Sequence, residues 1–440
     1  MTVFDSTVAI GQRRAAINQY LERRQLYPFQ IDAEPSSNLS LSIVIPCFNE
    51  TDVGRVLASL SKCDPPDGAV EVLVVINAPD GAGRAVEANN ARAKRQVTKA
   101  TNGTRLDWLQ FHAIQHNRLP STLAGVGLAR KIGMDEAAGR IVRSRGCDGV
   151  IVSLDADCVV SSDFMVRIDE EFRQFVDCPG ISINFEHRVA EQSSDPIHQA
   201  IVNYELHLRY FVAGQRLAGF PYAFHTIGSA MACRGSIYAQ QGGMNRRQGG
   251  EDFYFIQKLI ALGGYRSLNR TTVYPGIRIS NRVPFGTGPA IEKALKYSGT
   301  QNTFAPEIFA DLKHFCEAVV GTAPGELRKN AAGLPEPIVN YLESVNFSER
   351  VTEIERNVSS PAAFRKRIFR WFNAFRFLKY AQFASRHYYP KMQVSRAASE
   401  LAESAGIFHG GEDLQTADLL FRYRQLDRAA TERDFVKDLF

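Results

Sequence analysis

The sequence predicts an α/β protein: a mostly parallel sheet flanked by helices, followed by a helical C-terminal region. Three runs rich in β-branched residues have the length and apolar character of buried strands, at 39–46, 70–77 and 149–155. Helical patterns separate them, at 51–62, 82–99 and 124–143. This alternation is typical of βαβ units, whose parallel strands are covered by helices on both faces.

The remaining sequence places this sheet in the middle of the chain. Residues 1–38 have the pattern of a polar helix followed by a Pro/Ser-rich linker, and residues 39–290 hold the strands. Within that range, 218–290 is dense in glycine and aromatic residues and predicts short strands and loops. Residues 291–440 are helical almost throughout. We therefore expect an N-terminal extension at 1–38, a sheet domain at 39–290 and a helical region at 291–440.

Composition limits the class of protein. The chain has 440 residues, of which 45% are hydrophobic, and this suffices for the core of roughly two to three domains. A net charge of +5 fits anionic substrates or surfaces, but no nucleic-acid-binding motif appears and no nucleic-acid partner is expected. Seven cysteines form no CxxC pair, which indicates a reducing, cytoplasmic location. No signal-peptide pattern and no apolar run of about 18 residues is found, so we expect no membrane span.

The most specific motif is Asp155-Ala156-Asp157, at the end of the third predicted strand. Two carboxylates this close repel one another unless something compensates their charge. Residues i and i+2 of an extended segment project to the same side, so Asp155 and Asp157 can share a hard cation such as Mn²⁺ or Mg²⁺. The alternative is an ordinary strand end that leads into a turn.

Polar residues also follow the first two predicted strands, where ligands of open α/β sheets bind. Pro46 is expected to stop the first ladder, so that Asn49 and Glu50 can contact a base or ribose, although they equally fit a turn and helix cap. Asn77 and Asp80 follow the second strand. Arg130 or Lys131, in the helix before Asp155, could contact phosphate or be solvated surface charges.

Taken in order, Ile-Pro-Cys-Phe-Asn-Glu, Ala-Arg-Lys, Leu-Asp-Ala-Asp and Gly-Gly-Glu-Asp-Phe-Tyr-Phe resemble family 2 glycosyltransferases over about residues 39–290. The resemblance implies the GT-A nucleotide-diphospho-sugar fold, with a Rossmann-like sheet. It implies that the nucleoside and diphosphate are bound by Pro46, Asn49, Glu50, Asn77, Asp80 and Asp155, with Asp155 and Asp157 on the metal. Asn77 departs from the acidic residue that many members have there. The Gln-x-x-Arg-Trp signature of processive synthases is absent, which favours transfer of one sugar per binding event.

The resemblance also places Glu251 and Asp252 near the acceptor hydroxyl. A carboxylate within hydrogen-bond reach can act as general base, and Asp252 is expected at a helix N-terminus that keeps it ionised. The expected reaction is inverting transfer of one sugar from a nucleotide-diphospho-sugar to an acceptor hydroxyl. N-terminal capping of the helix remains an alternative for both residues. A retaining transferase or a non-catalytic nucleotide-sugar-binding protein are the other interpretations of the whole chain.

Three further segments bear on the site or its partners. His225 either contacts a ligand or is structural, and the small residues around Gly228 leave room for a ligand. Arg278 and Arg282 precede a glycine-rich stretch, as in a mobile loop that binds diphosphate, or are solvated charges. Residues 361–396 contain nine Lys or Arg and no acidic residue, with apolar positions at helical spacing. This predicts an amphipathic basic helix that docks on anionic lipid or packs on the catalytic domain.

Overall fold

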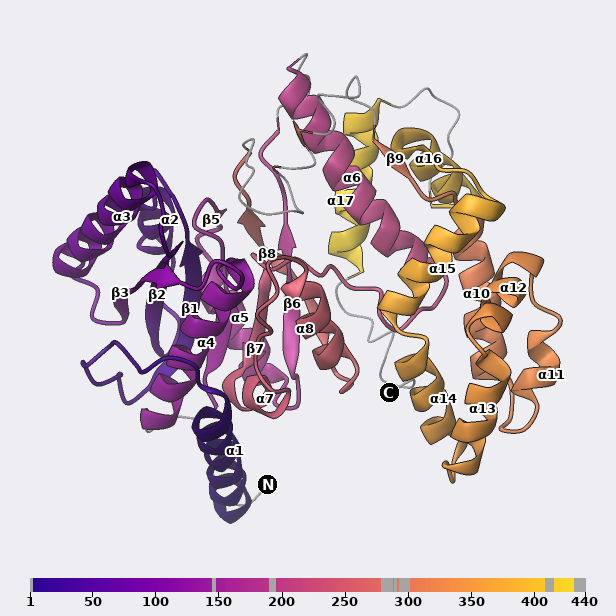
Figure 1. Ribbon diagram of the computed structural model, residues 1–440, viewed down its shortest axis with the longest axis horizontal. Coiled ribbons are helices and arrows are strands. Elements are labelled where there is room, and N and C mark those ends of the chain that lie inside the picture. Colours follow the sequence, from indigo (N-terminus) through magenta and orange to yellow (C-terminus); the bar gives the residue numbers. More distant parts are fainter. Residues whose placement is uncertain are drawn as a thin grey trace. The chain divides into compact units, whose positions relative to one another are not determined.

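The computed structural model describes residues 3–144, 148–189, 195–277, 288, 291–292, 301–407 and 415–430 (Figure 1). Its contacts divide the chain into two compact units. Unit 1 comprises residues 1–188, 226–259 and 265–289, and unit 2 comprises residues 189–225, 260–264 and 290–440. The unit boundary at 289/290 lies beside the predicted boundary at 290, whereas 1–38 lies within unit 1 and 189–225 within unit 2.

Unit 1 is built on a mixed, mostly parallel sheet, which in the described residues has eight strands in the order β3-β2-β1-β4-β7-β6-β8-β5. The strands are β1 Leu39–Cys47, β2 Ala69–Pro79, β3 Leu109–Leu119, β4 Val150–Ser153, β5 Val159–Val160, β6 Gly180–Phe185, β7 Met231–Arg234 and β8 Arg266–Tyr274. The pairs β3-β2, β2-β1, β1-β4 and β6-β8 are parallel. Strand β7 pairs antiparallel with β4 and β6, and β5 pairs antiparallel with β8. The predicted fold class is confirmed.

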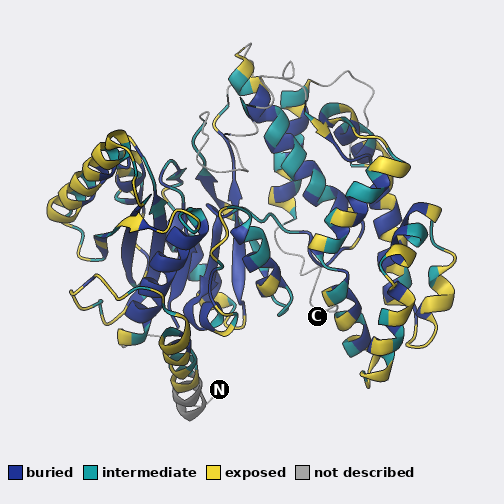
Figure 2. Cartoon of the chain, in the orientation of Figure 1, coloured by how far each residue is buried: buried dark blue, intermediate teal, exposed yellow. Residues whose placement is uncertain are grey.

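Helices cover this sheet and account for its continuous apolar strands. Their bounds are α1 Val3–Arg24, α2 Gly54–Leu60, α3 Arg84–Gly103, α4 Val126–Arg143, α5 Phe164–Gln174, α7 Gly235–Gln240 and α8 Glu251–Ile260. Strand β2 is buried along nearly its whole length (Figure 2) because both of its faces are covered. Helix α4 lies directly on the sheet: a Cβ on Gly133 would lie 2.4 Å from Val44 Cγ1. Tight packing of this helix fixes the position of the side chains near its N-terminus.

Unit 2 is helical in its described part, apart from a short antiparallel pair of strands. Its elements are α6 Pro196–Leu217, β9 Asn302–Thr303, α10 Glu307–Gly321, α11 Leu327–Ala331, α12 Glu336–Ser344, α13 Phe347–Arg356, α14 Pro361–Trp371, α15 Ala374–His387, β10 Met392–Gln393, α16 Val394–Ser404 and α17 Thr416–Ala429. Helix α17 packs along α6 (Figure 1). None of the described helices is both long and apolar enough to cross a bilayer.

The prediction of a single basic helix at 361–396 is wrong. The chain forms α14 and α15 there, and the break lies at Asn373, whose side chain accepts the N–H groups of Phe375 and Arg376 as an N-cap. The apolar side chains of Phe364 and Ile368 are fully buried within unit 2. Their burial disfavours insertion into lipid, and the side chains pack within unit 2 itself rather than on the catalytic domain, as the alternative had it.

Candidate active site

Arg130 in the first turns of α4 joins the two acidic motifs. Its Nη2 donates to Asp155 Oδ1 at 2.6 Å, and its Nη1 donates to Glu251 Oε1. The Arg130 side chain is only 4% exposed, and its pair with Glu251 is buried, whereas its pair with Asp155 lies at the edge of solvent. Motifs almost a hundred residues apart in the sequence therefore meet at one side chain, beyond the carboxyl end of β4.

Gly228 makes this arrangement possible. A Cβ at this position would lie 2.4 Å from Arg130 Nη1, so any other residue would displace the guanidinium. The Gly228 N–H also donates to Asp252 Oδ2 at 2.8 Å. The space expected for a ligand beside Gly228 is thus occupied by Arg130, and the prediction of room at this point was wrong.

Asp252 lies in the first turn of α8, after Gly250 in the left-handed conformation (φ +72°). Its Oδ1 accepts the N–H of Phe253 at 2.7 Å, so both of its oxygens bind backbone N–H groups. Burial raises the pKa of Asp252, although Arg130 and the two N–H groups act in the opposite direction. The expectation that the helix N-terminus dominates was incomplete, because desolvation outweighs it. A raised pKa makes Asp252 a stronger base.

Glu251 is more deeply buried than the neighbouring Asp252. It is 1% exposed, and burial raises its pKa against the opposing effect of Arg130. Because its carboxylate faces Arg130, it orients that side chain. Of the two acidic residues, Asp252 has the higher exposure.

The Asp155-Ala156-Asp157 motif follows β4 as a turn rather than as extended strand. The N–H of Cys158 donates to the Asp155 carbonyl at 3.1 Å, which closes the turn. The side chain of Asp155 is 38% exposed, so its carboxylate is accessible beside Arg130. The extended geometry expected for this motif was wrong, but both carboxylates remain partly exposed.

The donor set of these two residues fits a hard divalent cation. Carboxylate oxygens are the ligands that Mn²⁺ and Mg²⁺ prefer. Within the described ranges, no group of three or more His, Cys, Asp or Glu is arranged to hold a metal ion. Asp155 and Asp157 would therefore supply a minority of the ligands of such a cation.

The residues expected to bind the nucleoside gather beside β1 and β2. Asn49 adopts a left-handed conformation (φ +53°), and its N–H donates to Asn90 Oδ1 at 3.1 Å. Asn90 also donates to the Asn77 carbonyl at 3.0 Å, and Asn89 donates to Asn49 Oδ1 at 2.8 Å. Asn77 is 3% exposed, and its Oδ1 has no hydrogen-bond partner among the described residues. A buried acceptor without a protein partner is unusual, and an ordered water or a ligand donor would satisfy it.

Asn89 and Asn90 in α3 were missed as part of this region. Two consecutive asparagines within a helix are unfavourable for helix formation, because their side chains compete for backbone groups. That signal was available in the sequence. Here Asn90 instead connects the turn after β1 to the end of β2.

Pro46 does not end the first ladder as expected. Strand β1 continues through Pro46, paired with Val75, and ends at Cys47. Only the pairing with β4 stops earlier, at Val44 opposite Ser153. The missing N–H of Pro46 is therefore compatible with continued pairing to β2, and only the pairing to β4 ends before it. Glu50 is buried (6% exposed), whereas Asp80 is exposed beyond β2.

Lys131 was wrongly expected to contact phosphate. Its Nζ donates to Tyr20 of α1 at 2.6 Å and to Asp135 at 2.9 Å, and the residue is 5% exposed. Tyr238 donates to the same Asp135 at 2.7 Å. Lys131 and Asp135 therefore anchor α1 and α7 to α4. Arg282, expected to bind diphosphate, and Arg278 lie outside the described residues.

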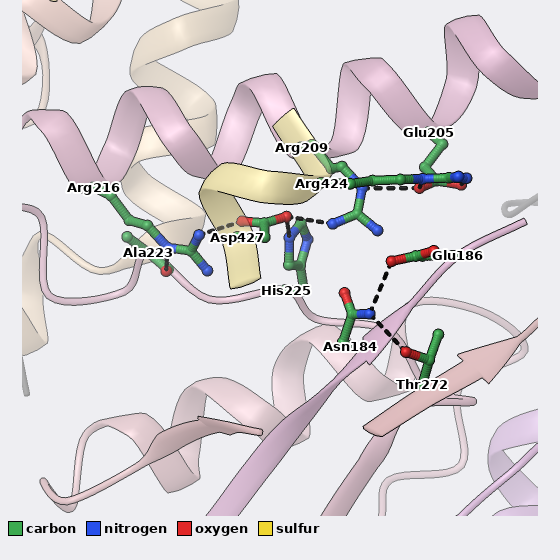
Figure 3. Close-up of polar contacts among 10 residues, drawn as sticks. All are labelled: Asn184, Glu186, Glu205, Arg209, Arg216, Ala223, His225, Thr272, Arg424 and Asp427. Atoms are coloured by element: carbon green, nitrogen blue, oxygen red, sulfur yellow. Dashed lines mark hydrogen bonds and ion pairs between the residues drawn. The ribbon is translucent and has the colours of Figure 1, made fainter. Parts of the chain in front are cut away.

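His225 belongs to unit 2 and has a structural role there. Its Nε2 lies 3.0 Å from Asp427 Oδ2, in a buried network that also contains Arg209 and Arg216 (Figure 3). Burial lowers the pKa of His225, and Asp427 opposes this shift. The structural alternative for His225 is therefore favoured.

Comparison with known proteins gives no family assignment. No family model matches the chain, and no curated protein matches it. Among solved structures, S. aureus TarS residues 1–349 in complex with UDP-GlcNAc is similar at 13% identity, with a TM-score of 0.38, over 89% of this chain and 91% of that one. The mannosyltransferase PcManGT from Pyrobaculum calidifontis, in complex with GDP-Man and Mn²⁺, is similar at 13% identity, with a TM-score of 0.36, over 98% of both chains. Similarity at this level assigns neither a fold family nor an activity to this chain.

Proposed function

We propose that this protein is a glycosyltransferase that moves one sugar from a nucleotide-diphospho-sugar to an acceptor hydroxyl, with inversion at the anomeric carbon. The proposal includes a GT-A-type catalytic domain and membership of glycosyltransferase family 2. The observation that supports it most is the joining of Asp155 and Glu251 by Arg130, close to Asp252. Three carboxylates, those of Asp155, Glu251 and Asp252, act on one guanidinium and leave a net negative site suited to a cation.

The donor would be bound by three groups of residues. Asn49 and Glu50 after β1, with the unpaired Oδ1 of Asn77, offer polar atoms to the nucleoside. Asp80 and Pro46 flank that position. Asp155 and Asp157 would hold Mn²⁺ or Mg²⁺, which when bound neutralises charge on the leaving diphosphate. Arg130 keeps Asp155 oriented by a charge-assisted hydrogen bond.

Asp252 would accept the proton of the acceptor hydroxyl as the sugar bond forms. Burial raises its pKa, and a higher pKa makes the carboxylate a stronger base. The N–H groups of Gly228 and Phe253 fix the carboxylate, so that its orientation is set before the acceptor arrives. Attack on the side of the sugar opposite the leaving diphosphate predicts inversion.

The test uses hydrolysis, since water can replace an unidentified acceptor. Nucleoside diphosphate release is measured over a panel of UDP- and GDP-sugars in Mn²⁺, and the first anomer released is identified by NMR. Asp252→Asn keeps the shape of the side chain and removes its basicity. We expect kcat to fall by about 10²- to 10⁴-fold, with donor affinity nearly unchanged. An α-linked donor should release the β-anomer first.

Two outcomes would overturn parts of the proposal. If Asp252→Asn lost donor binding while its kcat was kept, Asp252 would be a helix-capping residue. If the first product kept the donor's configuration, a retaining mechanism would replace the inverting one. Asp163→Asn is a suitable control, because Asp163 precedes a helix of the same unit and lies outside the acidic cluster.

A further inference from the structure

Unit 2 contains a pocket that the proposed reaction does not use. It lies among α12, α13, α14 and α15 and has a volume of about 880 Å³. This volume is in the range of small-ligand sites, which hold about 300–1,000 Å³. The pocket is therefore large enough for a compact ligand with several functional groups.

The pocket is strongly basic. Five of its lining residues are cationic and one, Glu353, is acidic: the cations are Arg350, Arg367, Arg370, Arg376 and Lys379. Glu353 pairs with Arg350 at the rim. The other four cations form no ion pair with a carboxylate in the described part of the chain. A concave surface lined by charges of one sign concentrates ligands of the opposite sign.

Local contacts hold two of these cations in position. The guanidinium of Arg376 lies 4.0 Å from the ring centre of Trp371, and Arg370 donates to the Ala261 carbonyl at 3.2 Å. Stacking on a ring leaves the in-plane N–H groups of an arginine free to bind another group. Nearby, burial and then Arg370 lower the pKa of Lys366, as expected in a positive environment.

We propose that this pocket binds a compact ligand that bears two or more phosphate groups. The three arginines without an ion pair among the described residues, Arg367, Arg370 and Arg376, favour phosphate, because the guanidinium fork matches two phosphate oxygens at once. A flat lipid surface fits less well, since Phe364 and Ile368, which would have to insert, are fully buried. The site is independent of the proposed transferase activity.

The test measures binding of inorganic tripolyphosphate to the full chain by titration calorimetry, in EDTA so that no divalent metal is present. Arg367 and Lys379 are exposed, so the double variant Arg367→Gln/Lys379→Gln is expected to fold. Each lost charge-assisted contact should weaken binding about tenfold, giving roughly a 100-fold loss for the pair. The matched control is Arg386→Gln/Lys329→Gln, which removes the same two charges from exposed positions outside the pocket.

The expected result is a large loss of affinity in the pocket variant and wild-type affinity in the control. Equal affinity in all three proteins, or an equal loss in both variants, would overturn the proposal. Citrate serves as a polycarboxylate of comparable charge, and binding as tight as that of tripolyphosphate would overturn the assignment to phosphate. Sedimentation with phosphatidylglycerol vesicles, without binding of tripolyphosphate, would show a lipid surface instead.

Discussion

At the residue scale, Arg130 has the largest consequences for the candidate active site. It is the cation that faces Asp155 and Glu251, and it lowers the pKa of Asp252 as well. Burial disfavours the charged forms of Glu251 and Asp252, and the guanidinium offsets part of that cost. A single side chain thus connects the metal-binding motif with the proposed base.

Replacing Arg130 should therefore shift the pH dependence of activity. Arg130→Gln removes the charge that lowers the pKa of Asp252, so that pKa rises and the base is protonated at a higher pH. We expect the acidic limb of the pH profile of kcat to move to higher pH. The free energy of unfolding should fall by about 3–5 kcal/mol, because buried carboxylates lose their partner. The measurements are a pH–rate profile and urea unfolding.

Arg130→Lys is the matched variant, because it keeps the charge and loses the two-pronged geometry. Its acidic limb should stay near that of the wild type, with a smaller loss of stability. An unchanged pH profile in Arg130→Gln would show that Arg130 does not act on the base.

Sequence reasoning found part of the site and missed its connection. The four carboxylates stand out in the sequence because a charged group directly after a buried strand, or at the start of a helix, usually has a partner or a function. They are Asp155, Asp157, Glu251 and Asp252. Which of two adjacent basic residues faces them could not be predicted: Arg130 and Lys131 differ by about 100° around α4, and only the packing of α1 decides that Lys131 turns away.

At the scale of elements, α17 is attached to α6 by buried charges. Asp427 accepts from Arg209 at 2.5 Å and from Arg216, while Glu205 accepts from Arg424 at 2.7 Å (Figure 3). Burial acts to raise the pKa of Asp427, but Arg216, His225 and Arg209 more than offset it and hold it well below its usual range. The ionised carboxylate therefore contributes to folding stability.

Asp427→Asn should destabilise unit 2. Breaking a buried ion pair costs about 3–5 kcal/mol at neutral pH. Because the folded pKa is depressed, this contribution is present above the unfolded value of 3.8 and is lost as pH falls from there toward the folded pKa. Urea unfolding between pH 7 and pH 3 should show a constant difference from the wild type down to about pH 4, which then narrows.

The exposed Asp418, in the first turn of the same helix, gives the control. Asp418→Asn should cost less than about 1 kcal/mol, since only a helix-end charge is lost. Equal effects of the two variants, or a difference for Asp427→Asn that does not depend on pH below 4, would contradict a role for the buried charge.

Helices and strands with a regular pattern of apolar residues were predictable from the sequence. Elements whose form depends on their place in the sheet or on a single capping residue were not. The predicted ends of β1, β2 and β4 agree with the observed ends of these strands to within two residues. Strand β3 was missed because it lies at the sheet edge and contains His112, Gln115 and His116 where a buried strand would be apolar. In 361–396 the helical spacing of apolar residues continues across Asn373, so only the cap shows that two helices are present.

At the scale of the whole molecule, the two units are interleaved in sequence. The chain passes between them at 188/189, 225/226, 259/260, 264/265 and 289/290. Composition changes along a sequence can locate a contiguous domain, but they cannot show that 189–225 joins the C-terminal helices through α6. The predicted division at 38 marks a linker in composition only, since α1 contacts α4 and α7 in unit 1.

Metal-dependent binding of a nucleotide sugar tests the account most directly. The melting temperature is measured with UDP- and GDP-sugars, in Mn²⁺ or in EDTA, for the wild type, for Asp157→Ala and for the Asp418→Asn control. At 100 times the dissociation constant a ligand stabilises the folded state by about 2.7 kcal/mol. We predict that at least one donor raises the melting temperature of the wild type and the control in Mn²⁺ and not in EDTA, and that Asp157→Ala folds but loses this increase. No increase with any donor, or an undiminished increase in Asp157→Ala, would contradict the account.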